Sequence, residues 1–445
     1  MASLLRAYLP SVLARRARAL PGALAALFLV TGAATASAQA DYAKDVAVAL
    51  QELEKQCGAL LTSKHIDWKP IEKEFTAAAK SVKTDQDHLV LLTRLLARLQ
   101  DGHCEVRPTE KTKDVKWPDA PELVGAGMFW CRSGKKILIK TAFGDAAAAG
   151  IESGSEVVKV DGKPVSGWLD ARIAKLLDTQ SCSTEQMTFY RATHQWLAMP
   201  KGTRLDLELK TAAGKTQKRT LTYTKGSYVP WGPALPIEGL ESAGDVHWKM
   251  LDERTGYVHV RRCKDDLPEL MDQALGKVGG ASGLILDFRA NGGGGFDHEA
   301  FLGRFVPAGE KLVGQITYES RGSRPYGGPI VVIVDAGTVS AGETGSGMFK
   351  EDGRGYVIGE TPTAGMSSQK TTIELPSGLF SLYVSTHSNK GRFNGGRGLE
   401  GIGVVPHELV AYEAKDLAAG VDTLIRRARE ILAKFPADKV PYKAH

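Results

Sequence analysis

The sequence predicts a multi-domain α/β protein with a small helical module, a β-rich middle domain and an α/β core. Apolar residues recur at intervals of three and four between residues 41 and 100, which is typical of packed helices. Short segments that alternate apolar and polar residues from about 120 to 228 indicate strands. Beyond that point, apolar runs alternate with helical segments, as in an α/β core. The expected division is 1–40 leader, 41–118 helical module, 119–228 middle domain, 229–412 core and 413–445 C-terminal helix.

Residues 1–40 have the features of a secretory signal. Four arginines precede an apolar segment, LPGALAALFLV, and a small-residue stretch follows with the cleavage pattern Ala36-Ser37-Ala38. The apolar segment is short for a membrane span, so cleavage is expected, and an uncleaved N-terminal anchor is the alternative. No cysteine stands at the cleavage point, which argues against a lipid anchor. The sequence therefore predicts export to the periplasm or outside the cell, with no indication of membrane association.

The composition is that of an ordinary globular protein, with 43% hydrophobic and 24% charged residues among 445. Lys and Arg number 57 against 51 acids. The leader holds four arginines and no acid, so the mature chain would carry 53 basic residues against 51 acids, a net charge of +2. Such a balance predicts no nucleic-acid partner.

The cysteines follow no redox or metal-binding spacing. There are five of them: Cys57, Cys104, Cys131, Cys182 and Cys263. Export permits disulfides, but an odd number leaves at least one thiol unpaired. Pairing of Cys57 with Cys104 is the first guess, because both lie in the helical module.

The strongest local signal is the stretch IVVIVDAGTVSAGETG at residues 330–345. Its first five residues form an uninterrupted apolar run, as in a strand that is buried on both faces. The residues DAG supply a sharp turn, and a helix-like segment follows. Ser340 would lie between strand and helix, where a hydroxyl is presented outward near a helix N-terminus. Two interpretations stay open, because Ser340 could be a nucleophile or only an N-cap.

Two further motifs carry residues suited to catalysis. The helical module ends in DGH, where Asp101 and Gly102 stop the last helix and His103 begins an extended segment. A capping or surface role for this histidine is the alternative. The glycine run at 291–295, after a buried strand, is either a nest of N–H groups for a developing oxyanion or a phosphate loop. The phosphate loop is the weaker interpretation, because no GK[ST] follows.

The middle domain opens with GAGM, and a second motif, AAAAGIESGSEVVKVDGKPV, follows. In this order the two resemble a PDZ domain of the bacterial protease type. The resemblance implies a loop whose backbone N–H groups bind the terminal carboxylate of a peptide, while the peptide adds as a strand to a sheet edge. A plain tight turn is the alternative. The loop residues are Gly125, Ala126, Gly127 and Met128, and a stiff connector, Pro230 to Pro236, leads to the core.

The motifs taken together resemble a peptidase family. LARLQDGH, the PDZ-like unit, LDFRANGGGG, TVSAGE, VIGETPTAG and EGIGVVP occur in the order seen in the C-terminal-processing and tricorn-type serine peptidases. The processing branch uses a lysine base in a GKGS-like stretch. This sequence has Gly365 at that position, and Lys370 lies beyond Gln369. A Ser-Lys dyad is therefore not expected.

Similarity to the tricorn-like branch implies a catalytic serine, histidine and glutamate. Carried over residue by residue, these are Ser340, His103 and Glu400. A serine hydroxyl needs a base to take its proton, and the imidazole needs an acid on its other nitrogen to hold its tautomer. The resemblance also implies that the backbone N–H groups of Gly293 and Ala341 stabilise the oxyanion.

The chain departs from the tricorn pattern at two positions. Gly102 stands where a second serine precedes the histidine, and His407 stands where an aspartate usually follows the final proline. Glu343 is a rival to Glu400, although its place one turn into a helix suits stabilisation of the helix N-terminus. Cys104 is not expected to be a nucleophile, because neighbours on an extended chain point to opposite faces. Three histidines without motif support are expected to be structural or on the surface: His88, His298 and His387.

The sequence thus predicts an exported serine endopeptidase without a metal or organic cofactor. Its PDZ-like domain would capture an extended or C-terminal segment of a protein or peptide and deliver it to Ser340, His103 and Glu400. The rival is a catalytically silent protein that holds peptides or apolar ligands on the same architecture. A scaffold whose PDZ-like unit recruits partners is a third interpretation.

Overall fold

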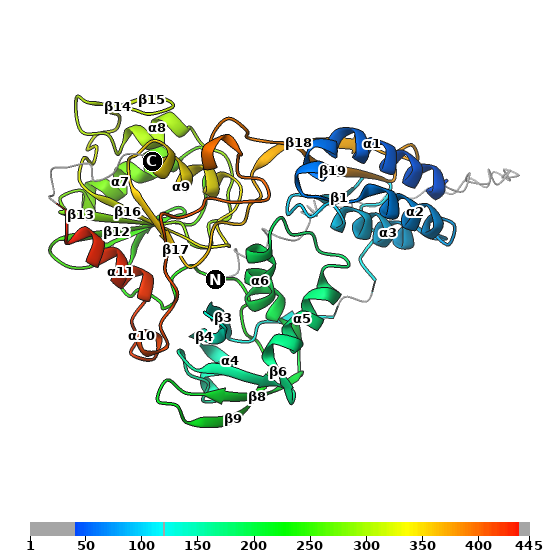
Figure 1. Cartoon of the computed structure of the whole chain (residues 1–445), viewed down its shortest axis with the longest axis horizontal. Coiled ribbons are helices and arrows are strands. Elements are labelled where there is room, and N and C mark those ends of the chain that lie inside the picture. The colour runs from blue at the N-terminus through cyan, green and yellow to red at the C-terminus, as the bar shows by residue number, and fades with distance from the viewer. Residues whose placement is uncertain (1–40, 119–120, 436–445) are drawn as a thin grey trace, which may run out of the picture.

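The protein has three parts that follow the patterns in its sequence. The structure is a computed structural model that describes residues 41–118 and 121–435. The predicted leader, with its cleavage pattern, lies outside the described residues. Figure 1 shows the helical module on the right, the middle domain below and the core on the left. The predicted α/β multi-domain class is confirmed.

Three helices form the helical module, as predicted. They are α1 (Tyr42–Ser63), α2 (Trp68–Ala79) and α3 (Asp85–Ala97). Each begins at a side chain that accepts a backbone N–H from the first turn, which satisfies a donor that the helix itself cannot. Their apolar faces pack into one hydrophobic cluster.

A hairpin from a distant part of the chain completes this module. Strands β18 (Ser368–Glu374) and β19 (Phe380–Ser388) pair antiparallel, and β1 (Glu105–Pro108) pairs with the other edge of β19. Helix α1 packs on β19, and the apolar residues of the hairpin share the cluster of the helices. The interval 229–412, predicted as core, therefore contributes one hairpin to the module, because an apolar sheet face needs a second layer.

A small antiparallel sheet forms the middle domain. Its strand order is β3, β4, β5, β8 and β9, with β6 beside β5. The bounds are β3 (Met128–Ser133), β4 (Lys136–Ala142), β5 (Glu156–Val160), β6 (Lys163–Pro164), β8 (Arg204–Lys210) and β9 (Thr216–Thr222). The helices of this domain are α4 (Gly144–Ala148), α5 (Val165–Leu176) and α6 (Glu185–Thr193). The predicted hairpin with a glycine turn is confirmed, because β8 and β9 pair antiparallel on either side of Gly214.

A seven-stranded sheet forms the core, and every pair from β12 to β20 is parallel. In sheet order the strands are β10 (Glu241–Ala243), β11 (Val246–Met250), β12 (Thr255–Val260), β13 (Gly283–Asp287), β16 (Ile330–Val334), β17 (Tyr356–Gly359) and β20 (Glu408–Leu409). The helices between them are α7 (Leu267–Val278), α8 (His298–Gly303) and α9 (Ala341–Glu351). Parallel strands joined by helical crossovers confirm the predicted α/β core.

Both faces of the core sheet are covered, which explains the uninterrupted apolar run in β16. Ile330 and Val332 pack with α7, α8 and α9, whereas Val331 and Ile333 pack with the C-terminal segment on the other face. That segment was predicted as one helix. It is divided into α10 (Ala414–Ala418) and α11 (Thr423–Leu432), because Gly420, with a φ of 73°, leaves the helical range.

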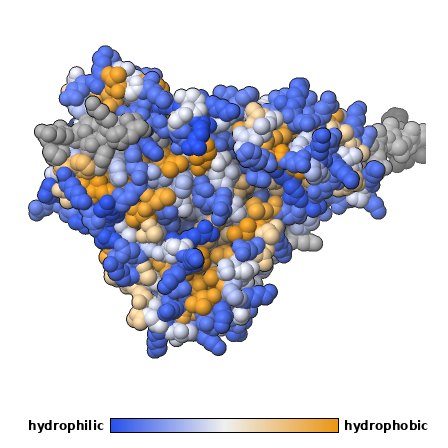
Figure 2. All heavy atoms as spheres, viewed as in Figure 1, coloured by the Kyte–Doolittle hydropathy of each residue, from blue (hydrophilic) through white to orange (hydrophobic). Residues whose placement is uncertain are grey.

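Buried ion pairs join the three parts. Lys64 of the helical module pairs with Glu400 of the core, and Lys140 of the middle domain pairs with Glu360 of the core. Polar residues cover most of the face in Figure 2, and apolar residues gather over the middle domain and its border with the core. Among the helices that the structure describes, none is long and apolar enough to cross a membrane.

Candidate active site

The predicted nucleophile and the glycine run lie side by side at one edge of the core sheet. Ser340 follows β16 and the run follows β13, and the carboxyl ends of these parallel neighbours meet. Val339 N–H donates to Asn291 O at 3.0 Å. A Cβ on Gly293 would lie 2.7 Å from the Cβ of Ser340, so the close approach requires glycine. The structure thus brings Ser340 and Gly293 together, as the resemblance implied.

Ser340 has a strained backbone. Its φ is 53° and its ψ is −122°, in a region that residues with a side chain rarely adopt. Ser340 also stands at the N-cap position of α9, as the alternative interpretation held. An ordinary N-cap adopts an extended conformation without this strain. The conformation therefore favours presentation of the hydroxyl as the reason for the turn.

The carboxylate of Glu343 ties α9 to the loop after β17. It is fully buried, and its Oε2 accepts the N–H groups of Ser340 at 3.1 Å and Met366 at 2.9 Å. Its Oε1 accepts Thr363 Oγ1–H at 2.6 Å and Gly365 N–H at 2.8 Å. Burial raises the pKa of Glu343 to about 8, against the effect of these donors. The role is wider than the expected stabilisation of a helix N-terminus, because the same carboxylate also holds the serine turn.

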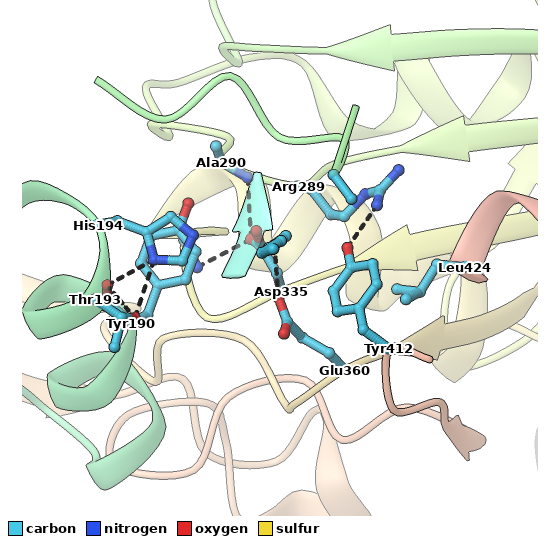
Figure 3. A network of polar contacts seen from close by, with 12 residues as sticks. Tyr190, Thr193, His194, Arg289, Ala290, Asp335, Glu360, Tyr412 and Leu424 are labelled. Atoms are coloured by element: carbon cyan, nitrogen blue, oxygen red, sulfur yellow. Dashed lines mark hydrogen bonds and ion pairs between the residues drawn. The ribbon is translucent and has the colours of Figure 1, made fainter. Parts of the chain in front are cut away.

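A second buried carboxylate, Asp335, connects the serine turn to the glycine-run turn. Its Oδ1 accepts Ala290 N–H at 3.0 Å and Gly337 N–H at 2.9 Å. Figure 3 shows Asp335 between Tyr190 of α6 on one side and Arg289 of the core on the other. Burial raises the pKa of Asp335 to about 6. The middle domain and the core therefore support the serine turn jointly.

The two predicted oxyanion donors differ in availability. Ala341 N–H, at the start of α9, makes no hydrogen bond within the part of the chain that the structure describes. Gly293 N–H donates to Asn291 Oδ1 at 2.8 Å. Asn291 is held in turn, because its Nδ2 donates to Val260 O at 2.7 Å. Ala341 is therefore the available donor, and Gly293 must leave Asn291 before its amide can act.

His103 lies between α3 and β1 and faces two carboxylates. Polar atoms of Asp101, His103 and Glu400 lie within 4.8 Å of one another, so the structure brings His103 and Glu400 together. Asp101 Oδ1 is 3.8 Å from His103 Nδ1. Carboxylates and imidazole also suit a metal ion, but Lys64 Nζ donates to Glu400 Oε1 at 2.7 Å. We assign no metal here, because this ammonium already balances the charge of Glu400.

Burial sets the protonation of this cluster. It lowers the pKa of His103 to about 4, and Asp101 opposes this shift. It raises the pKa of Glu400 to about 7, with the charge of Asp101 adding to the effect. For Asp101 burial would raise the pKa, but Lys64 and His103 outweigh it, and the pKa is lowered. His103 is therefore neutral near pH 7 and able to accept a proton. Three cations also lower the pKa of His103: Lys370, Arg191 and Lys64.

Three charged residues of this cluster were missed in the sequence. Asp101 was interpreted only as a helix stop, although its place two residues before His103 in a tight turn was a usable signal. Lys370 was set aside because it lies beyond the expected lysine position. It lies on β18, where burial lowers its pKa and the charges of Asp101 and Glu400 oppose that shift. Lys64 ends α1, 336 positions from Glu400, and no local pattern marks it.

The serine turn and the histidine turn meet through Met366. A Cβ on Gly102 would lie 2.8 Å from Met366 Sδ, so the two pack closely. Met366 N–H shares the Glu343 carboxylate with Ser340 N–H. Within the described residues no hydrogen bond joins Ser340 Oγ to His103. Both turns border the same junction, and proton transfer between them needs a closer approach, as is common before substrate binds.

The start of α6 joins the middle domain to both sides of this junction. Ser183 Oγ accepts Gly102 N–H at 3.1 Å. Gln186 Nε2 donates to Ile402 O at 3.1 Å, two residues after Glu400. The middle domain therefore contacts the histidine turn and the glutamate loop at once.

The loop predicted to bind a peptide carboxylate is covered. All four of its residues are buried: Gly125, Ala126, Gly127 and Met128. Gly125 N–H donates to Gly226 O at 2.7 Å, because the chain after β9 pairs with the loop. The N–H of Gly125 is therefore already engaged within the chain. Peptide binding at the loop stays a prediction, and it requires the segment at 226–228 to move.

The guessed disulfide is wrong in this structure. All five cysteines lie in the described residues and are free thiols. Cys57 and Cys104 both lie among the apolar residues of the helical module. Burial raises the pKa of Cys104 well above its usual value, which disfavours a nucleophilic thiolate, as expected.

The histidines without motif support stand apart from the cluster of His103. His88 is buried, and its Nε2 lies 3.0 Å from a carboxylate oxygen of Asp45, which indicates a structural role. His298 Nε2 lies 3.3 Å from Thr344 Oγ1, and His387 is exposed on β19. His407, which replaces the usual aspartate, accepts a backbone N–H of β17 through Nδ1 at 2.9 Å.

Comparisons with known proteins agree with this geometry. The profile of peptidase family S41 matches residues 254–410, which include the glycine run, Ser340 and Glu400. This part of the chain is therefore similar to the S41 serine peptidases. Among curated relatives, a chloroplastic C-terminal processing peptidase from Tetradesmus obliquus is 26% identical to this chain over 304 residues, which are 64% of this chain and 61% of that protein. A carboxyl-terminal-processing protease from Picosynechococcus sp. is 22% identical over 366 residues, 79% of each chain.

The solved structures show the fold. Mature CPAF complexed with lactacystin has a TM-score of 0.62 against this chain at 14% sequence identity. The likeness covers 88% of this chain and 97% of that chain. It therefore extends beyond the core to the helical module and the middle domain.

Proposed function

We propose that this protein is an exported serine endopeptidase of the S41 type, with Ser340 as nucleophile, His103 as base and Glu400 as a supporting acid. The observation that carries the proposal is the strained turn of Ser340 against Gly293 at the end of β16. Such strain persists only where the surrounding structure holds it, and it places a hydroxyl beside backbone N–H groups. A purely structural serine would not need it.

The reaction follows from the groups at the junction. His103 takes the proton of Ser340 Oγ as the oxygen attacks the carbonyl carbon of a peptide bond. The oxyanion is stabilised by Ala341 N–H and, once released from Asn291, by Gly293 N–H. Loss of one such donor typically costs about 3 kcal/mol of transition-state stabilisation. His103 passes the proton to the leaving amine, and water activated by His103 then hydrolyses the acyl-enzyme.

We place the substrates among proteins and peptides with an accessible C-terminus. The names of the C-terminal-processing relatives support this class, and so do the contacts of the middle domain with both sides of the junction. Capture would use Gly125 to Met128 in the PDZ-like manner, after the covering segment moves aside. The leader-like residues 1–40 support export to the periplasm or beyond.

Labelling with a fluorophosphonate probe tests the proposal. The mature chain should be modified at Ser340, as detected by mass spectrometry, and Ser340→Ala and His103→Ala should both lose the label. Lys370→Met is the matched control, because Lys370 is the other candidate base near the junction. Retained labelling in Lys370→Met supports the histidine. Loss in Lys370→Met with retention in His103→Ala would assign a Ser-Lys pair instead, and an unlabelled wild-type chain would reject the serine enzyme.

A catalytically silent peptide- or ligand-binding protein is the second candidate. One observation favours it: within the described residues Ser340 and His103 share no hydrogen bond, and Gly293 N–H is engaged by Asn291. Such a protein would bind peptides equally well in the wild-type and Ser340→Ala chains. Calorimetric peptide binding without probe labelling would move the assignment to this class.

A further inference from the structure

The imidazole of His103 has two carboxylates beside it, and they are not equivalent. Asp101 Oδ1 lies 3.8 Å from His103 Nδ1. A carboxylate oxygen of Glu400 lies within 4.8 Å of one of the two ring nitrogens of His103, but Glu400 Oε1 is bound by Lys64 Nζ at 2.7 Å. His103 Nδ1 itself is buried and has no hydrogen-bond partner among residues 41–118 and 121–435. A buried polar atom left unpaired destabilises the folded state, so closing one of these contacts is favourable.

Asp101 is the better placed of the two acids. Its Oδ1 already accepts the backbone N–H of His103 at 2.9 Å, which holds the carboxylate in the same turn as the ring. Its own N–H donates to Ser181 Oγ at 2.7 Å, and the residue is 2% exposed. The separation of 3.8 Å between Asp101 Oδ1 and His103 Nδ1 is about 1 Å longer than a hydrogen bond, so a small approach of the two side chains would close it.

The charge states of the two acids also favour Asp101 as the partner of the His103 ring. Lys64 and His103 outweigh burial and keep the pKa of Asp101 low, whereas burial raises the pKa of Glu400 to about 7. At neutral pH Asp101 therefore carries a full negative charge and Glu400 is partly protonated. The other charged groups that act on the ring oppose an imidazolium, and they are Lys64, Arg191 and Lys370. Because these cations disfavour a positive charge on the ring, an ionised carboxylate in contact with it would stabilise the imidazolium.

We infer that Asp101 is a positioning residue that accepts His103 Nδ1–H, holds the tautomer with Nε2 free and balances the imidazolium charge. Glu400 and Lys64 then form a supporting ion pair beside it. The inference rests on the proposed function. The Ser340 Oγ–H proton moves to Nε2 as the Oγ–C bond forms, and it leaves with the amine when the C–N bond breaks. Asp101 stays ionised throughout.

The test compares Asp101→Asn with Glu400→Gln in the full mature chain, because each substitution preserves shape and removes a charge. The readout is the second-order rate constant for fluorophosphonate labelling of Ser340 across a pH series. Asp101→Asn should slow labelling by about 10²- to 10⁴-fold near neutral pH, since an amide favours the wrong tautomer, and Glu400→Gln should slow it less. The apparent pKa of labelling should also move to lower pH in Asp101→Asn. If Asp101 had only a structural role, its substitution would not shift the apparent pKa of labelling.

The outcomes separate the inference from the proposed function. If Asp101→Asn labels within about threefold of the wild type while Glu400→Gln is inactive, the inference is wrong and Glu400 is the orienting acid. An unlabelled wild-type chain instead rejects the proposed function, and the inference falls with it. Labelled wild type with both variants unaffected rejects only the inference.

Thermal unfolding checks that each variant folds. Should Asp101→Asn fail to fold, ¹⁵N NMR of histidine-labelled protein decides, with the His103 signal assigned by comparison with His103→Ala. A hydrogen-bonded Nδ1–H that persists in Glu400→Gln supports Asp101 as the acceptor. Its loss in Glu400→Gln overturns the inference.

Discussion

Lys64 Nζ lies 2.7 Å from Glu400 Oε1, and this ion pair joins the end of α1 to the loop before β20. The side chain of Lys64 is 7% exposed and that of Glu400 is wholly buried. The same ammonium donates to the backbone oxygen of Gln100 at 2.7 Å, directly before the DGH turn. One lysine thus links the two segments that carry the proposed base and its supporting acid.

Removal of Lys64 should destabilise the protein. Lys64→Met leaves Glu400 buried without its cation, which typically costs about 3 to 5 kcal/mol of unfolding free energy, as measured by urea denaturation. Adding Glu400→Gln to Lys64→Met should recover much of the loss, because the double variant buries no unpaired charge. If the losses of unfolding free energy in Lys64→Met and Glu400→Gln simply add in the double variant, Lys64 and Glu400 do not act as a coupled pair.

The second interdomain pair should behave in the same way. Lys140, 2% exposed, lies 2.8 Å from Glu360. Burial alone would lower the pKa of Lys140, but Glu360 and Asp335 hold it above its usual value. Lys140→Met should lower the unfolding free energy by about 3 to 5 kcal/mol and slow probe labelling, because Asp335 supports the serine turn. Lys113→Met, which breaks an exposed pair with Glu110, is the control and should change neither quantity appreciably.

The stability contribution of Glu400 should fall as pH rises. Burial raises its pKa in the folded protein to about 7, from a usual value of 4.5. The folded state then binds the proton more tightly than the unfolded state, so the contribution is full below pH 4.5 and is lost as pH rises through 7. The unfolding free energy of the wild type minus that of Glu400→Gln should decline over this window, by at most about 1.4 kcal/mol per pH unit. A difference that grows with pH would mean that Lys64 keeps Glu400 ionised.

Two glycines of the run make a matched pair. Gly293 has a φ of 69°, and a Cβ there would lie 2.7 Å from Ser340 Cβ and 2.9 Å from Val339 O. Gly295 has no atom within 4 Å of a built Cβ. Gly293→Ala should abolish probe labelling and destabilise by about 1 to 3 kcal/mol, measured by thermal unfolding. Gly295→Ala should label within about twofold of the wild type. Equal labelling of Gly293→Ala and Gly295→Ala would show that the serine turn tolerates a side chain at position 293.

Several elements could be predicted because their signals are local. The helices of the module follow from apolar spacing, β16 from five consecutive apolar residues, and β8 and β9 from alternation around a glycine turn. The motifs shared with the peptidase family predicted Ser340, His103 and Glu400 as site residues, and their catalytic roles stay predictions. The placement of the β18–β19 hairpin on the helical module could not be predicted in the same way. An apolar strand face does not specify which layer will cover it.

The sequence by itself determined the α/β class, the strand-turn-helix around Ser340 and the set of residues with chemistry to offer. These depend on neighbours in the chain and on backbone preferences that act over a few residues. Only the tertiary structure decided that Lys64 pairs with Glu400, that Asp101 is the acid nearest the His103 ring, and that the chain at Gly226 covers the loop at Gly125. The reason is that burial and charge pairing act through space, and they are set only when distant segments pack together.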